Sequence, residues 1–221
     1  MNKSNADFWH QRWRENNIAF HEGRVNGYLK LYFGRLQLQP GEGVFVPLCG
    51  KALDMIWIRD QGHRVLGVEL SPIAVRDFFS ENGIDYAMEN VAPFEQYRSD
   101  GIEILCGDLY DMNGTHLQDV RGVYDRASYI AFDEVGRDAY AEFMCRNLPR
   151  GANVLLLTLE YPQSVMSGPP FSVGEKDVRR RFERRYRIEL LESRDIIASQ
   201  PHFQAKGLPH LIAHAFVLRD P

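Results

Sequence analysis

The chain has 221 residues, which suffices for one substantial hydrophobic core and is short for two. Hydrophobic residues make up 44% and charged residues 25%, and the formal charge of −4 gives no reason to expect a nucleic-acid partner. No apolar run approaches the roughly 20 residues of a membrane-spanning helix, and the polar, aromatic N-terminus lacks the apolar core of a signal peptide. We therefore expect a cytoplasmic protein that binds neither membrane nor nucleic acid.

The cysteines and histidines exclude two kinds of site. Cys49, Cys106 and Cys145 are far apart and form no Cys-x-x-Cys pair, which favours free thiols in a reducing compartment. The seven histidines show no metal-binding spacing, so we predict no metal site.

The first half of the chain alternates between helical and strand patterns. Apolar residues from Val25 to Leu36 recur at helical spacing and predict a helix. The run Val44–Val46 predicts a short buried strand, and residues Leu53–Gly62 predict the helix that follows it. A second strand is expected at Arg64–Leu70, with the sequence RVLGVEL.

The alternation continues with a helix and two more strands. The helix is predicted to begin at Ser71, whose hydroxyl can accept a hydrogen bond from the first turn, with Pro72 at the first helical position. Gly83 is expected to end it. Strands are predicted at Ile102–Cys106 and Gly122–Asp125.

The last part of the chain defines the fold class. A helix over Tyr140–Leu148 precedes the most apolar strand, Asn153–Leu159, whose sequence NVLLLTL is typical of a strand covered on both faces. Two further strands, RRYRIELLES at 184–193 and HLIAHAFVL at 210–218, are separated by a short loop-rich segment, so we expect an antiparallel terminal pair. This pattern predicts a single α/β domain over residues 1–221, with a doubly wound, mostly parallel sheet and helices on both faces.

A ligand site is expected where the first two strands end, because α/β sheets bind ligands beyond the carboxyl ends of their strands. Gly50, in the loop Pro47–Lys51, lets a ligand approach the backbone closely, although an ordinary tight turn is the alternative. Glu69 ends the second strand 19 positions later, where an acidic side chain can bind both ribose hydroxyls. The alternative for Glu69 is a solvated carboxylate.

Polar residues also follow the third and fourth strands, at the same end of the sheet. Either Asp108 or Asp111 can accept a hydrogen bond from an adenine amino group. Arg126 offers planar donors that suit a carboxylate. The alternative for Arg126 is an internal ion pair with Asp125 or another acid.

Aromatic and basic groups complete the set of candidates. Trp9, Trp13 and Phe20 can cover a flat or cationic ligand, and core filling is the alternative. The rigid loop Gly168–Phe171 is a second candidate for covering the site. The basic run RRRFERRYR at 179–187 resembles a nucleic-acid patch, but the negative overall charge favours a solvated face.

Taken together, these motifs resemble the thiopurine S-methyltransferase family. The resemblance extends from about Asp7 to the C-terminal strand, and its most specific parts are the Pro-Leu-Cys-Gly-Lys loop and Gly67–Glu69. The residues that carry it are Phe8-Trp9 and Trp13, Ala19-Phe20-His21, Val46 to Lys51, Gly62-His63, Gly67 to Ser71, Asp125-Arg126 and Gly168 to Phe171.

The resemblance implies a Rossmann-like, seven-stranded sheet and an enzyme of detoxification. Such an enzyme moves the methyl group of S-adenosylmethionine to the sulfur of aromatic or heterocyclic thiols such as thiopurines, and leaves S-adenosylhomocysteine. We assign no catalytic residue, because the thiolate of an acidic heterocyclic thiol needs little help from a base. Phe20 matches the thiol pocket, and Arg126 can face the thiol or the cofactor. The implied cofactor contacts are Trp9, Trp13, Leu48, Gly50, Glu69, Asp108, Leu109 and Arg126.

Further expectations concern the ends of the chain and the acceptor. We expect a monomer with a helical, aromatic lid region at residues 1–36. In a late loop, His202 or Phe203 stands where animal members have an arginine near the thiopurine. Because bacterial relatives are associated with selenium and tellurium methylation, that activity is one alternative, and a non-catalytic adenosine-nucleotide-binding module is another. An NAD-dependent oxidoreductase is disfavoured, since a pyrophosphate requires a glycine-rich turn.

Overall fold

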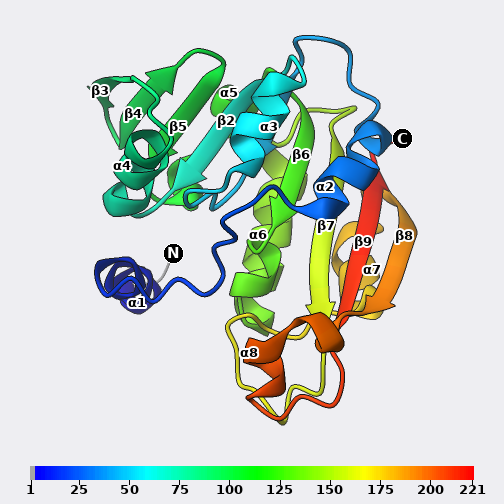
Figure 1. Cartoon of the computed structure of the whole chain (residues 1–221). Helices are drawn as coiled ribbons and strands as arrows, with labels where there is room; N and C mark the ends of the chain where they lie inside the picture. The colour runs from blue at the N-terminus through cyan, green and yellow to red at the C-terminus, as the bar shows by residue number, and fades with distance from the viewer. Residues whose placement is uncertain (1–2) are drawn as a thin grey trace.

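The computed structural model describes residues 3–221, in which nine strands form one sheet in the order β3-β4-β5-β2-β1-β6-β7-β9-β8 (Figure 1). Strands β5, β2, β1, β6 and β7 run parallel, whereas β9 pairs antiparallel with both β7 and β8. The first two residues of the predicted lid region lie outside the described residues. The strands are β1 Gly43–Val46, β2 Arg64–Glu69, β3 Ala87–Val91, β4 Phe94–Ser99, β5 Ile102–Cys106, β6 Val120–Arg126, β7 Asn153–Glu160, β8 Arg187–Asp195 and β9 Ile212–Arg219.

Helices cover both faces of the sheet, which confirms the doubly wound α/β class and its antiparallel terminal pair. Leu29, Met55 and Phe78, from α2, α3 and α4, share one core cluster with the sheet. Tyr140 and Val178, from α6 and α7, belong to the cluster on the other face. The helices are α1 Lys3–Arg14, α2 Gly27–Tyr32, η1 Phe33–Leu36, α3 Asp54–Asp60, α4 Pro72–Glu81, η2 Leu109–Asp111, α5 Gly114–Leu117, η3 Tyr129–Ala131, α6 Glu134–Asn147, α7 Glu175–Phe182, η4 Ile197–Ser199 and α8 Pro201–Gln204.

The sheet has two strands more than the seven that the resemblance implied. Strands β5, β2, β1, β6, β7, β9 and β8 supply the expected seven, and the hairpin of β3 and β4 extends the sheet beyond β5. All of β3 is exposed. Because neither of its faces is buried, its sequence AMENV does not need the alternation of apolar and polar residues that marks a half-buried strand, and lacks it. The hairpin therefore could not be recognised by periodicity.

Two other segments differ from expectation. The predicted helix over Val25–Leu36 divides into α2 and the short 3-10 helix η1, and α2 begins where Asn26 accepts a hydrogen bond from the Tyr28 amide at 2.9 Å. The loop expected between the last two strands contains η4 and α8. These helical segments are only three and four residues long, which is too short to leave a periodic signal.

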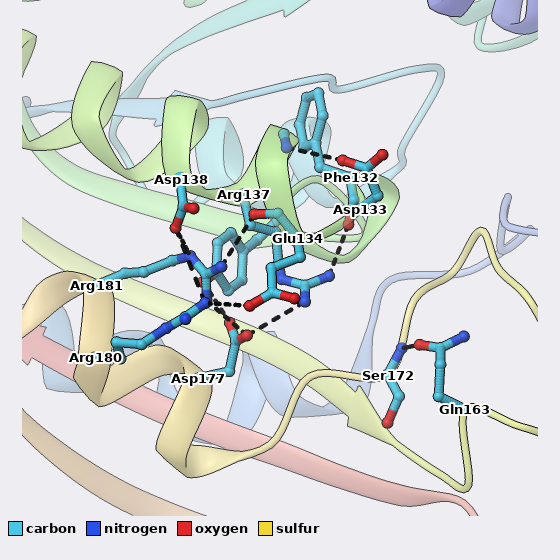
Figure 2. Close-up of polar contacts among 12 residues, drawn as sticks. Phe132, Asp133, Glu134, Arg137, Asp138, Gln163, Ser172, Asp177, Arg180 and Arg181 are labelled. Atoms are coloured by element: carbon cyan, nitrogen blue, oxygen red, sulfur yellow. Dashed lines mark hydrogen bonds and ion pairs between the residues drawn. The ribbon is translucent and has the colours of Figure 1, made fainter.

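The arginine-rich run is solvated only in part: Arg180, Arg184 and Arg187 are exposed, whereas the side chains of Arg181 and Arg185 are buried beside α6 (Figure 2). The side chain of Arg181 is 4% exposed and pairs with Asp177 at 2.6 Å and Asp138 at 2.7 Å. Arg137 of α6 reaches the same Asp177 carboxylate at 3.3 Å. Arg185 is also buried and donates to backbone carbonyls just after α6. These arginines join the two helices to each other.

The carboxyl ends of β1, β2, β5, β6 and β7 define one end of the sheet, called here the carboxyl edge. Helices α1 and α8 both lie toward this edge, although they are far apart in the chain (Figure 1). No helix within residues 3–221 is long and apolar enough to cross a bilayer. The carboxyl edge, with α1 beside it, is where the predicted site residues meet.

Candidate active site

Glu69 and Gly50 meet at the carboxyl edge, as their spacing predicts. One carboxylate oxygen of Glu69 accepts a hydrogen bond from the Gly50 amide at 2.9 Å, and the other accepts from the Ser71 amide at 2.8 Å. Glu69 is only 6% exposed, so the alternative of a solvated carboxylate is wrong. Burial raises the pKa of Glu69 to about 7, and the backbone donors partly oppose this rise.

The loop Pro47–Lys51 bends sharply to bring Gly50 to this position. Leu48 and Gly50 both have left-handed backbones, with φ of +44° and +52°, and such a φ is uncommon for a residue with a side chain. A Cβ atom on Gly50 would lie 3.2 Å from Cζ2 of Trp13. The left-handed turn therefore favours glycine at position 50, and a side chain there would press on the Trp13 ring.

The three predicted aromatic residues form one cluster over this loop. Phe20 makes edge-to-face contacts with Trp9 and with Trp13, each with ring centroids 5.6 Å apart. Trp13 is 5% exposed, whereas Trp9 and Phe20 are half-buried. Helix α1 thus places its aromatic face on Gly50, and the chain returns through Phe20 to close the cluster.

Arg126, the last residue of β6, holds the segment that follows α1. Its guanidinium donates to the Phe20 carbonyl at 3.1 Å and pairs with Glu22 at 3.3 Å. The internal partner of Arg126 is therefore Glu22 and not Asp125. The Nε atom of Arg126 is buried and has no hydrogen-bond partner within the described part of the chain. That donor remains available for an anionic group.

Asp125 has a structural role beneath Arg126. Its carboxylate accepts hydrogen bonds from the Tyr140 hydroxyl at 2.6 Å and from the Tyr129 amide at 3.1 Å. Burial raises the pKa of Asp125 to about 6. These contacts fix the turn after β6, where Ala127 has a φ of +64°.

The structure places the remaining predicted cofactor residues beside the end of β5. Asp108 is half-buried and caps η2 by accepting a hydrogen bond from the Tyr110 amide at 3.0 Å, whereas Asp111 is exposed at the far end of η2. This placement favours Asp108 over Asp111 as the residue facing the site. The Leu109 side chain is 2% exposed and belongs to the hydrophobic core.

Three residues at the carboxyl edge were not predicted as site residues: Ser71, Lys51 and His21. The Ser71 hydroxyl was expected to cap α4, but it is buried next to Glu69 without a hydrogen-bond partner among residues 3–221. Lys51 is nearly buried and pairs with Glu81 at 2.7 Å. His21 directly follows Phe20, so its place in that motif was the available signal. The same residues 3–221 contain no group of three potential metal ligands.

Solved structures with a similar fold are methyltransferases. A methyltransferase dependent on S-adenosylmethionine from Anabaena variabilis has a TM-score of 0.65 at 13% identity, covering 98% of this chain and 95% of that one. The 1,6-didemethyltoxoflavin-N1-methyltransferase of Burkholderia thailandensis, solved with S-adenosylhomocysteine, has a TM-score of 0.64 at 14% identity, covering 98% and 87%. The fold is that of the S-adenosylmethionine-dependent methyltransferases.

Sequence comparison then defines the family. The profile of the family "Thiopurine S-methyltransferase" matches residues 4–220. Proteins named thiopurine S-methyltransferase are 45% identical in Nitrosospira multiformis, over 96% of both chains, and 43% identical in Pseudomonas putida, over 95% of this chain and 96% of the relative. The chain belongs to the thiopurine S-methyltransferase family. It is a methyltransferase enzyme, S-adenosylmethionine is the implied methyl donor, and neither alternative function is favoured.

Proposed function

We propose that this enzyme transfers the methyl group of S-adenosylmethionine to the sulfur of an aromatic or heterocyclic thiol, with thiopurines as one such class. The observation that carries the proposal is the buried contact between Glu69 and Gly50 beneath the aromatic cluster. The names of the relatives supply the acceptor class.

The residues of the carboxyl edge fit the methyl donor. The Glu69 carboxylate suits two ribose hydroxyls, and the unpartnered Ser71 hydroxyl lies beside it. The buried Nε of Arg126 suits the carboxylate of the amino-acid tail. Trp9 and Trp13 present aromatic rings that suit a sulfonium cation. Leu48, Gly50, Asp108 and Leu109 complete the proposed contacts.

The main task of the protein is alignment and exclusion of water. When bound, S-adenosylmethionine supplies a methyl group on a positively charged sulfur. Holding an acceptor in line with that group contributes up to roughly 7–11 kcal/mol. Phe20 is proposed to line the thiol pocket with Arg126. Because opposite charges neutralise during transfer, an apolar enclosure favours the reaction.

The loop Gly168–Phe171 is proposed to complete that enclosure. The Phe171 amide donates to the Ile130 carbonyl at 2.7 Å, just after the end of β6, and the Tyr161 hydroxyl donates to the Pro170 carbonyl at 2.5 Å. These contacts attach the loop to Ile130 in η3 and to Tyr161, which directly follows β7.

We also propose that residues 1–36 act as the lid region, and that the enzyme works in the cytoplasm in detoxification. The free cysteines support a reducing compartment.

Calorimetric titration with S-adenosylhomocysteine tests the cofactor site through Glu69→Ala. Two hydrogen bonds to a charged group contribute about 1.5–3 kcal/mol each, so we expect the affinity to fall at least about 100-fold. Glu189→Ala is the control, because Glu189 lies on β8 and pairs with Arg35 on the surface. Unchanged affinity in Glu69→Ala would remove Glu69 from the ribose role.

The acceptor is tested in the same preparation by methyl transfer to an aromatic thiol. Binding of S-adenosylhomocysteine together with turnover supports the proposed S-methylation. Binding without turnover on any thiol would overturn the thiol assignment and redirect attention to selenium or tellurium compounds.

A further inference from the structure

Asn26, the residue that caps α2, is attached to β6 and to the start of α3. Its side-chain oxygen accepts a hydrogen bond from the Tyr28 amide at 2.9 Å, and its own backbone amide donates to the Asp54 carboxylate at 2.7 Å. Asp54 is the first residue of α3, is 1% exposed, and also accepts from the Tyr124 hydroxyl of β6 at 3.4 Å. These contacts leave Asn26 little freedom to move relative to the sheet.

The side chain of Asn26 continues this network towards Arg126. Its amide nitrogen donates to Oε2 of Glu22 at 3.4 Å, and the same oxygen lies 3.3 Å from Nη2 of Arg126. The Glu22 side chain is 42% exposed, so it loses conformational entropy when it keeps one orientation. Asn26 and Arg126 hold it by the same oxygen atom. Asn26 and Glu22 are called here the relay.

The two outer nitrogens of Arg126 fix the direction of the third. Nη2 pairs with Glu22, and Nη1 donates to the Phe20 carbonyl at 3.1 Å. Because a guanidinium group is planar and rigid, holding both Nη atoms also sets the direction of the Nε–H bond. Nε is buried and has no hydrogen-bond partner within residues 3–221. The relay therefore keeps in one direction the donor that is proposed to bind the cofactor carboxylate.

We propose that Asn26 is a positioning residue that, through Glu22, orients Arg126 towards the carboxylate of the amino-acid tail, and so makes the site select adenosine thioethers that carry such a tail. The inference rests on the proposed function and deepens it at the cofactor site. A ligand without a carboxylate leaves the buried Nε–H of Arg126 unpaired, which lowers affinity. A guanidinium turned away from the ligand loses this selectivity although it keeps its charge.

Two ligands separate a positioning role from a general loosening of the site. S-adenosylhomocysteine carries the amino-acid tail, whereas 5′-methylthioadenosine has the adenosine and the thioether without it. We expect the wild type to bind S-adenosylhomocysteine at least about tenfold more tightly in calorimetry, because a hydrogen bond between charged groups contributes about that factor. A substitution that acts only through Arg126 weakens the first ligand alone, whereas one that loosens the enclosure weakens both.

Asn26→Asp and Asn26→Ser both retain a side chain that caps α2, because Asp and Ser suit that position as well as Asn does. Asn26→Asp replaces the donor to Glu22 by a like charge, and we expect the affinity for S-adenosylhomocysteine to fall about tenfold. Asn26→Ser removes the donor without adding a charge, and the long hydrogen bond of 3.4 Å predicts a smaller, roughly threefold loss. Both variants should leave the affinity for 5′-methylthioadenosine unchanged.

Asn113→Asp is the matched control. Asn113 caps α5 by accepting from the Thr115 amide at 3.0 Å, and α5 precedes the start of β6, at the opposite end of that strand from Arg126. The control should change neither affinity. Equal losses for both ligands in the Asn26 variants, or no loss for S-adenosylhomocysteine, would overturn the positioning role and leave the cofactor site intact. Equal affinity of the wild type for the two ligands would also overturn it. If the wild type binds neither ligand, the proposed function fails first and the positioning role fails with it.

Discussion

Glu69 combines a proposed ligand role with a raised pKa, because its carboxylate is buried at the end of a strand, where two backbone amides donate to it. A ribose hydroxyl donates most strongly to the ionised carboxylate. Protonation and cofactor binding therefore compete at the same side chain. Sequence spacing identified Glu69 and Gly50, but the raised pKa of Glu69 depends on how completely the surrounding elements exclude water.

The affinity for S-adenosylhomocysteine should depend on pH through Glu69. The pKa of Glu69 is raised from 4.5 to about 7 in the ligand-free protein, so the carboxyl gains a proton as the pH falls below 7. We expect affinity to be constant above that pH and to weaken by up to about tenfold per pH unit below it. Calorimetry across this range measures the profile, and Glu69→Gln is the control that should lack the inflection. A wild-type affinity that is flat through pH 7 would contradict the prediction.

The raised pKa of Glu69 affects the free energy of unfolding in the opposite direction from cofactor affinity: a lower pH favours the folded state. Between pH 4.5 and about 7 the folded chain holds the Glu69 proton more firmly than the unfolded chain does. The contribution of Glu69 to the free energy of unfolding is therefore fully present below pH 4.5 and is lost as the pH rises through 7. The ionised Glu69 carboxylate strengthens the proposed cofactor binding, whereas burial in the folded protein favours the protonated carboxyl.

At the scale of elements, the loop after β1 and helix α1 act together. The left-handed loop brings Gly50 under Trp13, and Arg126 attaches the segment after α1 to the end of β6. The strands and the aromatic residues were predictable from periodicity and composition. The attachment through Glu22 and Arg126 was not, because it joins residues that are far apart in the chain.

Gly50→Ala should weaken cofactor binding and stability together. A non-glycine residue in the left-handed region costs about 1–2 kcal/mol, and the new methyl group would also press on Trp13. We expect Tm to fall by roughly 2–8 °C and affinity for S-adenosylhomocysteine to fall about tenfold or more, measured by calorimetry. Gly62→Ala is the matched control. Its φ is +88°, but a Cβ atom there meets nothing within 4 Å, so stability alone should fall. Equal affinity in both variants would contradict the role of Trp13 as a cover.

At the scale of the whole molecule, two helical layers enclose one sheet, and polar networks join the outer helices. Asp177 of α7 accepts from the Tyr129 hydroxyl at 2.7 Å and pairs with Arg137 and Arg181 (Figure 2). This network lies on the face of the sheet covered by α6 and α7. None of its residues is among the proposed cofactor contacts.

Asp177→Ala should therefore lower stability without changing cofactor affinity. Removing one partner of a buried ion pair costs about 3–5 kcal/mol, and Asp177 is 19% exposed, so we expect a loss of about 3 kcal/mol in urea denaturation. Glu134→Ala breaks the exposed pair with Arg180 and should cost less than about 1 kcal/mol. A larger loss in Glu134→Ala than in Asp177→Ala would contradict this assignment.

The chain is expected to be a monomer, because both edges of the sheet disfavour self-pairing. Strand β3 exposes Met88 and Val91, but Glu89 lies between them, and a charged residue on an exposed edge strand opposes pairing with a second copy. Strand β8 at the other edge carries Glu189 and Arg194. Light scattering after size-exclusion chromatography should give the mass of one chain. A dimer mass that persists on dilution would contradict the expectation.

The sequence by itself determined the fold class, the direction of the main strands and the identity of Gly50 and Glu69, the two residues that meet at the carboxyl edge. These features depend on local periodicity and on the spacing of residues within one βαβ unit, and both can be read from residues close together in the sequence. The family resemblance implied the seven-stranded core. The exposed hairpin of β3 and β4 was not predictable, because an edge strand without a buried face leaves no periodic pattern.

Only the tertiary structure decided which charges meet at the carboxyl edge. The pairing of Arg126 with Glu22, the burial of Glu69 and the pairing of Lys51 with Glu81 each depend on segments brought together by folding. Protonation and charge pairing respond to distance and to exclusion of water, and neither quantity is local in the sequence. That is why composition identified an aromatic segment at the N-terminus, whereas its attachment over Gly50 emerged only from the folded chain.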